Sequence, residues 1–291
     1  MNKKILLLTI SILLLIFVAA YLIFKPTSPK NVQTELRSIT DKQFLTEDTT
    51  RGALSIELSI EVPVAYTKSS ILDKIKSEIY LQLVGEQYLT MPEDTILPSF
   101  VAALKAEYLN NNAFVADKIS KTDFLVLNNS FYMEGFSLLN DEHIFTYGIL
   151  RDVDFGGNHP TRTRFFFNYD LKTGEQISED DIFIAGYEEE LTALLRAEVQ
   201  RISKENDEMP TIDSYENSIY TIEAIRPNGN FYINDEGICF VFNPYEIAPL
   251  SYAYEIEVMI NYQQLKTLMK ENNPLQYLVL QHETALSENN N

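Results

Sequence analysis

The chain of 291 residues contains one cysteine, three histidines and no tryptophan. A single cysteine, Cys239, cannot form a disulfide within the chain, and its place in the apolar run Ile238–Phe242 predicts a buried structural thiol. His143, His159 and His282 lie far apart, so the sequence has no motif of closely spaced zinc ligands. The composition therefore predicts neither a disulfide framework nor a metal centre.

The short motifs of common catalytic sites are also absent. There is no G-x-S-x-G elbow, no glycine-rich phosphate loop and no dinucleotide fingerprint. Asp152 and Asp154 resemble the start of a calcium loop, but Thr163 stands where a bidentate glutamate is needed. With 42 acidic residues, carboxylate pairs of the kind that cleave glycosides arise by chance. We therefore predict no catalytic residue, no metal ion and no cofactor, and keep a wall-polymer hydrolase or deacetylase as the alternative.

Basic residues are scarce, since 23 Lys and Arg stand against 42 Asp and Glu for a formal charge of −19. Four of these bases lie in residues 1–34, which contain no acid, so the remaining 257 residues carry 19 bases against 42 acids, or −23. Such a charge repels nucleic acid and favours cationic partners, although it also serves solubility.

The one long apolar run, Ile5–Phe24, contains no charged residue and is long enough to cross a bilayer as a helix. Lys3 and Lys4 precede it, which predicts a cytoplasmic N-terminus and an extracytoplasmic remainder. A cleaved signal peptide is the alternative, but Ala19-Ala20 is followed by further apolar residues rather than by a cleavage region. We favour an uncleaved anchor in the cell membrane.

The rest of the chain has the pattern of an α+β protein: antiparallel sheets with helices packed on one face, in two consecutive subdomains after the transmembrane helix. We expect an anchor at 1–25, a tether at 26–50, a first domain at 51–150, a second at 151–265 and a polar tail at 266–291. Leu275–Leu280 in that tail could add one more strand.

Apolar residues at every second position predict strands, and apolar residues one helical turn apart predict helices. Strands are expected at 53–62, 123–133, 144–153, 165–169, 219–225, 230–233, 237–242 and 254–260, and helices at about 70–84, 95–109 and 187–202.

Two loops carry the candidate binding residues. Asn158 and His159 lie in the loop Gly156–Pro160, where His159 is either a general base or a backbone-bonded loop residue. Tyr245 and Glu246 lie between Pro244 and Pro249, and Tyr252 follows. A rigid loop with tyrosines suits a binding surface because ordering it costs little entropy, but Tyr245 could instead plug the end of a sheet.

Two stretches of the sequence resemble a known extracytoplasmic module. Residues 154–183, DFGGNHPTRTRFFFNYDLKTGEQISEDDIF, resemble its aromatic-rich pattern around "GGAHP", followed by "N(F/Y)DL-TG" and "L-DLF". Residues 229–265, GNFYINDEGICFVFNPYEIAPLSYAYEIEVMINYQQL, resemble its later pattern around "YEIAPY". The module is shared by RsiV-type anti-sigma factors and PdaC-type peptidoglycan deacetylases, and the resemblance covers about 151–265. Residues 51–150 resemble the companion domain that often precedes it.

The resemblance implies a binding module outside the membrane, which recognises lysozyme in the anti-sigma members and accompanies a catalytic domain in the deacetylases. The short stretch before Ile5 leaves no room to hold a sigma factor, and the metal motifs of the deacetylase domain do not occur. Asn158 stands where alanine is commoner, and Leu250 where an aromatic residue is usual. We therefore expect a protein that captures a lysozyme-like cationic protein or peptidoglycan glycan.

Overall fold

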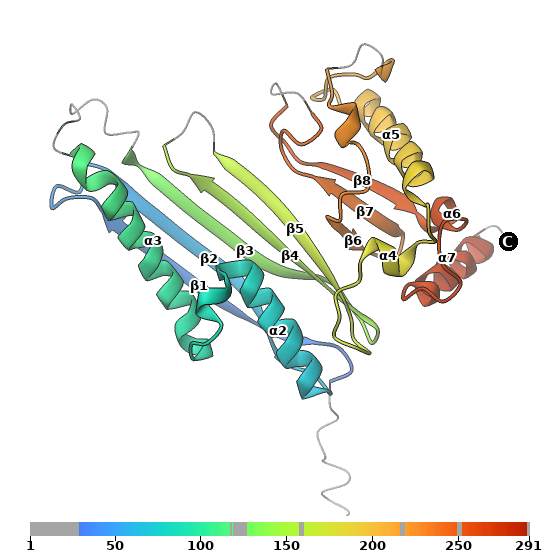
Figure 1. Ribbon diagram of the computed structural model, residues 1–291, viewed down its shortest axis with the longest axis horizontal. Helices are drawn as coiled ribbons and strands as arrows, with labels where there is room; N and C mark the ends of the chain where they lie inside the picture. Colours follow the sequence, from blue (N-terminus) through green and yellow to red (C-terminus); the bar gives the residue numbers. More distant parts are fainter. Residues whose placement is uncertain are drawn as a thin grey trace, which may run out of the picture.

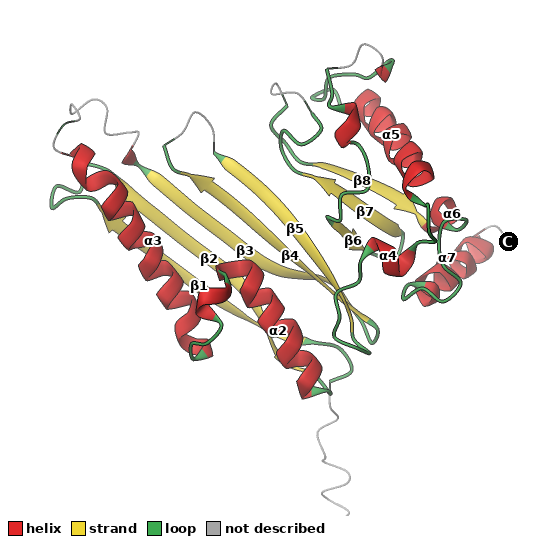
Figure 2. Ribbon diagram, in the orientation of Figure 1, coloured by secondary structure: helices red, strands yellow, loops and turns green. Residues whose placement is uncertain are grey.

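A computed structural model describes residues 29–116, 118, 127–156, 160–215, 219–248 and 252–289. Two β-sheets lie side by side, each with helices packed against it (Figures 1 and 2). The α+β class is thus confirmed. No helix in the described ranges is both long and apolar enough to cross a membrane, and the expected anchor at Ile5–Phe24 falls outside them.

The first sheet has five strands in chain order: β1 (Gln33–Phe44), β2 (Ala53–Ala65), β3 (Asn129–Asn140), β4 (Ile144–Asp154) and β5 (Thr161–Asp170). Neighbouring strands are antiparallel except β2 and β3, which are parallel. Between these two the chain forms α2 (Ser69–Val84), the 3-10 turn η1 (Glu86–Tyr88) and α3 (Glu93–Ala116). A parallel pair requires such a crossover, so the sheet is mixed.

Both α2 and α3 cover the same face of this sheet (Figure 1). The predicted alternation of β2 points Leu54, Ile56, Leu58, Ile60 and Val62 into the core, where they meet the helical stripe Ile71, Ile75, Ile79 and Leu83. On the opposite face Ser55 and Glu57 are exposed. At β2 the core therefore lies on one side of the sheet only, whereas Thr146 of β4 and Phe166 and Asn168 of β5 are buried on the opposite face, toward the second half.

The segment expected to be a tether forms the edge strand β1. The sequence did not indicate this strand by alternating apolar residues, because the face that meets the helices is largely polar. Arg37 donates to Glu93 on α3 at 2.7 Å, and Lys105 of α3 donates to Asp41 at 2.8 Å. Ion pairs attach this strand to the helix, and Ile39 on the same face packs against the first core.

The second sheet consists of β6 (Phe231–Ile233), β7 (Gly237–Phe242) and β8 (Ile256–Asn261), all antiparallel. Every residue of β7 is buried. Around the sheet lie α4 (Glu179–Ile182), α5 (Glu188–Glu205), the 3-10 turn η4 (Ile222–Ala224), α6 (Tyr262–Leu265) and α7 (Gln276–Asn289). Leu191, Leu195 and Val199 of α5 are fully buried in this second core, as their spacing predicts.

Three further expectations differ from the structure. Residues 219–225 form no strand in their described part; they include η4. The expected polar tail contains α7, whose preceding and first-turn residues Leu275, Leu278 and Val279 are buried in the second core. The first sheet extends through Asp170, so strands β4 and β5 carry it past residue 150.

Candidate binding surface

Different segments of the chain lie at the two ends of the molecule. Near the start of β1, Val32 donates its N–H to Asn140 at the end of β3, and Thr67 donates to Pro29 O at 2.5 Å. At the other end β4 finishes, β5 begins and β7 ends (Figure 1). The described residues that flank the candidate loops are thus remote from the point where the described chain begins.

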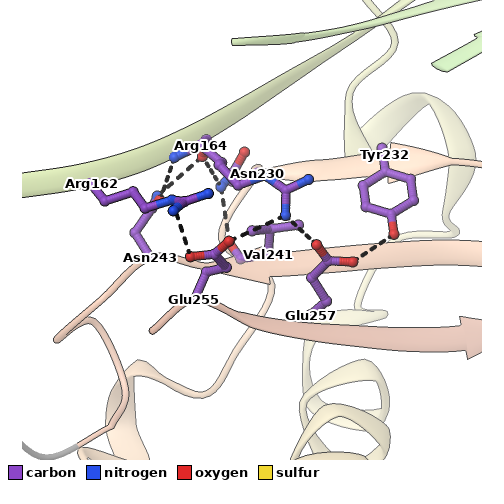
Figure 3. A network of polar contacts seen from close by, with 8 residues as sticks. All are labelled: Arg162, Arg164, Asn230, Tyr232, Val241, Asn243, Glu255 and Glu257. Carbon is purple, nitrogen blue, oxygen red and sulfur yellow. Dashed lines mark hydrogen bonds and ion pairs between the residues drawn. The ribbon is translucent and has the colours of Figure 1, made fainter. Parts of the chain in front are cut away.

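The two sheets are joined by a polar junction between β5 and the second sheet (Figure 3). The guanidinium of Arg164 lies 3.5 Å from Glu255 and also contacts Glu257 on β8. Tyr232 donates to Glu257 at 2.8 Å, and Arg162 lies 3.8 Å from Glu255. Because each of these carboxylates has a basic partner, the junction is a structural clamp rather than a reactive pair.

Two asparagines complete the junction by bonding the backbone of β5. Asn243 accepts from Arg164 N at 2.6 Å and donates to Arg164 O at 3.2 Å (Figure 3). Asn230 donates to Arg164 O at 2.9 Å and accepts from Phe166 N at 3.1 Å. Side chains therefore satisfy backbone groups of β5 that a sixth strand would otherwise bond.

Tyr245 follows this junction in a tight turn. Glu246 N donates to Asn243 O at 3.0 Å, and Tyr245 has φ +69°, a value that glycine normally adopts at this place in a type II turn. A left-handed conformation costs a residue with a Cβ about 1–2 kcal/mol. The ring is 38% exposed, so the strain holds an aromatic side chain at the surface.

Glu246 holds this turn in place. Its carboxylate accepts from Asn243 N at 2.8 Å and from Asn228 Nδ2 at 3.0 Å. Both oxygens are therefore engaged inside the protein. The predicted site residue acts on Tyr245 through the backbone rather than by offering a free charge.

Tyr252 is buried in the second core, with 6% of its surface exposed. Tyr254, whose ring centroid lies 5.3 Å from that of Tyr252, is 60% exposed. The exposed aromatic of this loop is thus Tyr254, which the sequence analysis did not select. Asn158 and His159 lie outside the described residues, but next to them Asp154 accepts from Gly156 N at 2.9 Å, as a turn-forming residue does.

A cleft of about 890 Å³ lies at the end where the described chain begins. Each of its carboxylates has a partner: Glu142 pairs with Lys30, Glu175 pairs with Lys74, Asp170 accepts from Lys172 N, and Asp181 accepts from Ser178 in a capping box. The hydrogen bonds of Ser178 hold the pKa of Asp181 below its usual range. No free acid and base converge here, and none of the described candidate residues lines the cleft.

The two described histidines pack against tyrosine rings, and the cysteine lies in the core. The ring of His143 lies against Tyr277 at a centroid distance of 4.4 Å, and His282 lies edge-on to Tyr262. Cys239 is buried as predicted, and burial raises the pKa of its thiol to about 12. Among the described residues no three His, Cys, Asp or Glu side chains are placed to hold a metal ion.

Sequence reasoning missed the junction, although a signal existed. Arg162 and Arg164 alternate along β5, and Glu255 and Glu257 alternate along the chain into β8. Residues two apart in a strand share a face, so each pair marks one charged strip of opposite sign. Matching the strips would have indicated that β5 faces the second sheet, where β6 is its neighbour.

The chain is similar to proteins whose function is not described. A family model described as "Protein of unknown function (DUF3298)" matches residues 180–263. A crystal structure of a DUF3298 family member from Bacteroides fragilis superposes with a TM-score of 0.75 at 23% identity, over 85% of this chain and 97% of that one. A DUF3298 family protein from Pseudomonas aeruginosa gives a TM-score of 0.52 at 16% identity, over 84% and 98%. These structures share the fold, and no curated protein matches the sequence.

Proposed function

We propose that the chain is a membrane-anchored envelope protein whose folded part lies outside the membrane and captures a cationic, lysozyme-like protein without transforming it. Residues 180–263, which match the family model, fall inside the stretch 151–265 that resembles the module of RsiV-type and PdaC-type proteins. This overlap supports the relationship to the RsiV-type and PdaC-type module. The anchor would be the apolar run Ile5–Phe24.

The observation that carries the proposal is the turn at Tyr245. An exposed tyrosine in a strained conformation, braced by Glu246 and followed in the chain by exposed Tyr254, is pre-organised for contact. Tyrosine supplies a large contact area at a low entropic cost, and rigid loops lose little freedom on binding. The turn follows β7, which ends at the end of the molecule remote from the start of the described chain (Figure 1).

The charge of the chain supports a cationic partner. Beyond residue 34 the formal charge is −23, which attracts a basic protein over several ångströms and raises the rate of encounter. The same charge disfavours nucleic acid. Charge would thus guide the partner to the molecule, while the tyrosines would set the fit.

A calorimetric titration of the full chain with lysozyme tests the proposal. We expect binding at about 20 mM salt that weakens at least about tenfold at about 300 mM, because the Debye length shortens. Tyr245→Ala should weaken binding, whereas Leu280→Ala on α7, which also removes an exposed apolar side chain, should not. Absence of binding at low salt would remove lysozyme as the partner. Binding of glycan strands would make glycan the ligand, and their turnover would favour the enzyme.

The location can be tested with a cysteine reporter. Cys239 is buried and its thiol stays protonated, so it gives little background. Ser55→Cys places a thiol on the exposed face of β2. A membrane-impermeant maleimide should label this variant in intact cells. Labelling only after the cells are opened would contradict the extracytoplasmic location.

A further inference from the structure

A small pocket lies between α3 and the starts of strands β2 and β3 in the five-stranded sheet. Its volume is about 150 Å³. Apolar and aromatic side chains form part of its walls, and four further polar side chains line it: Leu54, Leu104, Tyr108 and Phe155 with Glu107, Asn111, Asn112 and Asn129. It belongs to the same end of the molecule as the Tyr245 turn, because Leu54 and Asn129 begin β2 and β3 and Phe155 follows β4 (Figure 1).

The pattern of the sequence builds this pocket. Leu104, Glu107 and Tyr108 lie one turn apart on α3 and so share a face. Leu54 and Asn129 are partners across the parallel pair of strands, which brings the amide of Asn129 beneath that face. Helix and sheet thus contribute one wall each.

Asn129 carries a polar atom that the protein leaves unsatisfied. The residue is 8% exposed, and its Oδ1 has no hydrogen-bond partner. Two neighbouring groups donate elsewhere: Tyr108 donates its hydroxyl to Leu127 O at 2.8 Å, and Asn112 donates to Tyr108 O at 2.8 Å. A buried acceptor without a donor is unfavourable, so this oxygen favours a ligand that brings an N–H.

Glu107 adds a negative charge at the same place. It is exposed, and no basic side chain in the described ranges lies within ion-pairing distance of its carboxylate. The neighbouring Lys105 is taken up by Asp41 at 2.8 Å. Phe155, which is 62% exposed, adds an aromatic face of the kind that attracts cations.

We propose that this pocket binds the charged end of one arginine or lysine side chain presented by a partner protein. The aliphatic stem would pack on Leu54 and Leu104, and the N–H groups would meet Asn129 Oδ1 and the carboxylate of Glu107. A guanidinium or an ammonium is the ligand that satisfies an unpaired acceptor and an unpaired carboxylate together. This inference rests on the proposed capture of a cationic protein and assigns that partner an anchoring side chain.

Small cations test the pocket without the partner. The probes are N-acetyl-arginine amide and N-acetyl-lysine amide, and the control ligand is N-acetyl-citrulline amide, which has the shape of the arginine probe but no charge. Saturation-transfer NMR and calorimetry with the full chain should show weak binding of the charged probes and at least about tenfold weaker binding of the citrulline compound. Equal binding of charged and neutral probes would overturn the inference.

Matched variants locate the binding. Glu107→Gln, at an exposed position, should weaken the charged probes about tenfold, as loss of one charge-assisted hydrogen bond predicts. Glu190→Gln removes the same charge from an exposed position on α5 and should change nothing. Asn129→Asp should strengthen binding, because it places a second carboxylate in the pocket. If the charged probes bind Glu107→Gln as tightly as they bind the unmodified chain, the inference is overturned, whether or not Asn129→Asp folds.

The outcome for this pocket is separable from that for the proposed function. If the charged probes bind and depend on Glu107 while lysozyme does not bind, the pocket stands and the choice of lysozyme falls. If lysozyme binds but Glu107→Gln leaves both the probes and lysozyme unaffected, the capture function stands and the pocket falls.

Discussion

The two sheets of the molecule differ in how far their faces are buried. The five-stranded sheet is covered by α2 and α3 on one face, and its other face carries exposed residues such as Ser55 and Glu57. In the three-stranded sheet every residue of β7 is buried. The first half therefore offers open surface, whereas the second is a closed core that supports loops.

The boundary between the halves shows how they act together. Arg164, Asn230 and Asn243 join them through side-chain hydrogen bonds (Figure 3). The rings of Phe166 and Tyr232 add an aromatic contact at a centroid distance of 4.9 Å. A polar junction of this kind has fixed geometry, because each hydrogen bond requires its own direction. It holds the Tyr245 turn of the second half beside the loop ends of the first.

Substitution of Asn168 should have the largest effect on the contact between the two halves. It is 1% exposed, accepts from Thr146 Oγ1 at 2.9 Å and Ile233 N at 3.2 Å, and donates to Phe231 O at 2.8 Å. Asn168→Ala leaves two backbone groups of β6 without this partner, so we expect a loss of about 3 kcal/mol in the free energy of unfolding. Urea unfolding followed by circular dichroism measures it.

The control for this variant is Asn110→Ala, at an exposed position on α3, which should change stability by less than about 0.5 kcal/mol. If the two variants lost similar amounts, the junction would contribute nothing specific. If Asn168→Ala split the transition in two, the halves would be shown to unfold separately once their joint is weakened.

Tyr245 tests whether the second half stores strain for binding. Tyr245→Gly removes the cost of a left-handed Cβ, so we expect a gain of up to about 1 kcal/mol in stability together with weaker capture of a cationic protein. Unfolding and titration of the same preparation measure both effects. A variant that lost stability and kept full affinity would show that the turn serves packing alone.

The pH dependence of stability due to Glu179 tests how far the second half shields this carboxyl from water. Burial raises the pKa of this carboxyl above its ordinary 4.5, although Gly229 N and Tyr187 Oη donate to it at 2.8 and 3.0 Å. The folded state then binds the proton more tightly than the unfolded state. The free energy of unfolding should therefore fall as pH rises from about 4.5 through the raised pKa.

Glu179→Gln keeps an acceptor but removes the titration, so its stability should fall less across that pH range. Glu190→Gln, exposed on α5, should follow the unmodified chain. Urea unfolding at several pH values compares them. Identical pH profiles for the unmodified chain and Glu179→Gln would mean that this carboxyl is not buried in solution.

The sequence predicted best those elements that bury apolar side chains in a regular period. Strand β2 and helices α2 and α5 were placed within about three residues, since one face of each is apolar. Strand β1 was missed because Arg37 and Asp41 face the helices as ion pairs. Helix α7 was missed because the run Leu275–Leu280 fits a strand as well as a helix.

The candidate surface was predicted less well, for a physical reason. Loop residues follow no period, so alternation cannot tell buried Tyr252 from exposed Tyr254. The role of Glu246 as a brace depends on Asn228, which lies 18 residues away in the chain. The pocket at Asn129 requires α3 to cross two strands, a contact that no local pattern contains.

Photocrosslinking in intact cells tests the central claim most directly. A benzophenone amino acid replaces exposed Tyr254 or, as a control, Lys172 in the cleft at the opposite end, and lysozyme is added from outside. We predict a crosslinked adduct from position 254 and none from position 172. No adduct from position 254, or equal yields from both positions, would contradict capture at this end of the molecule.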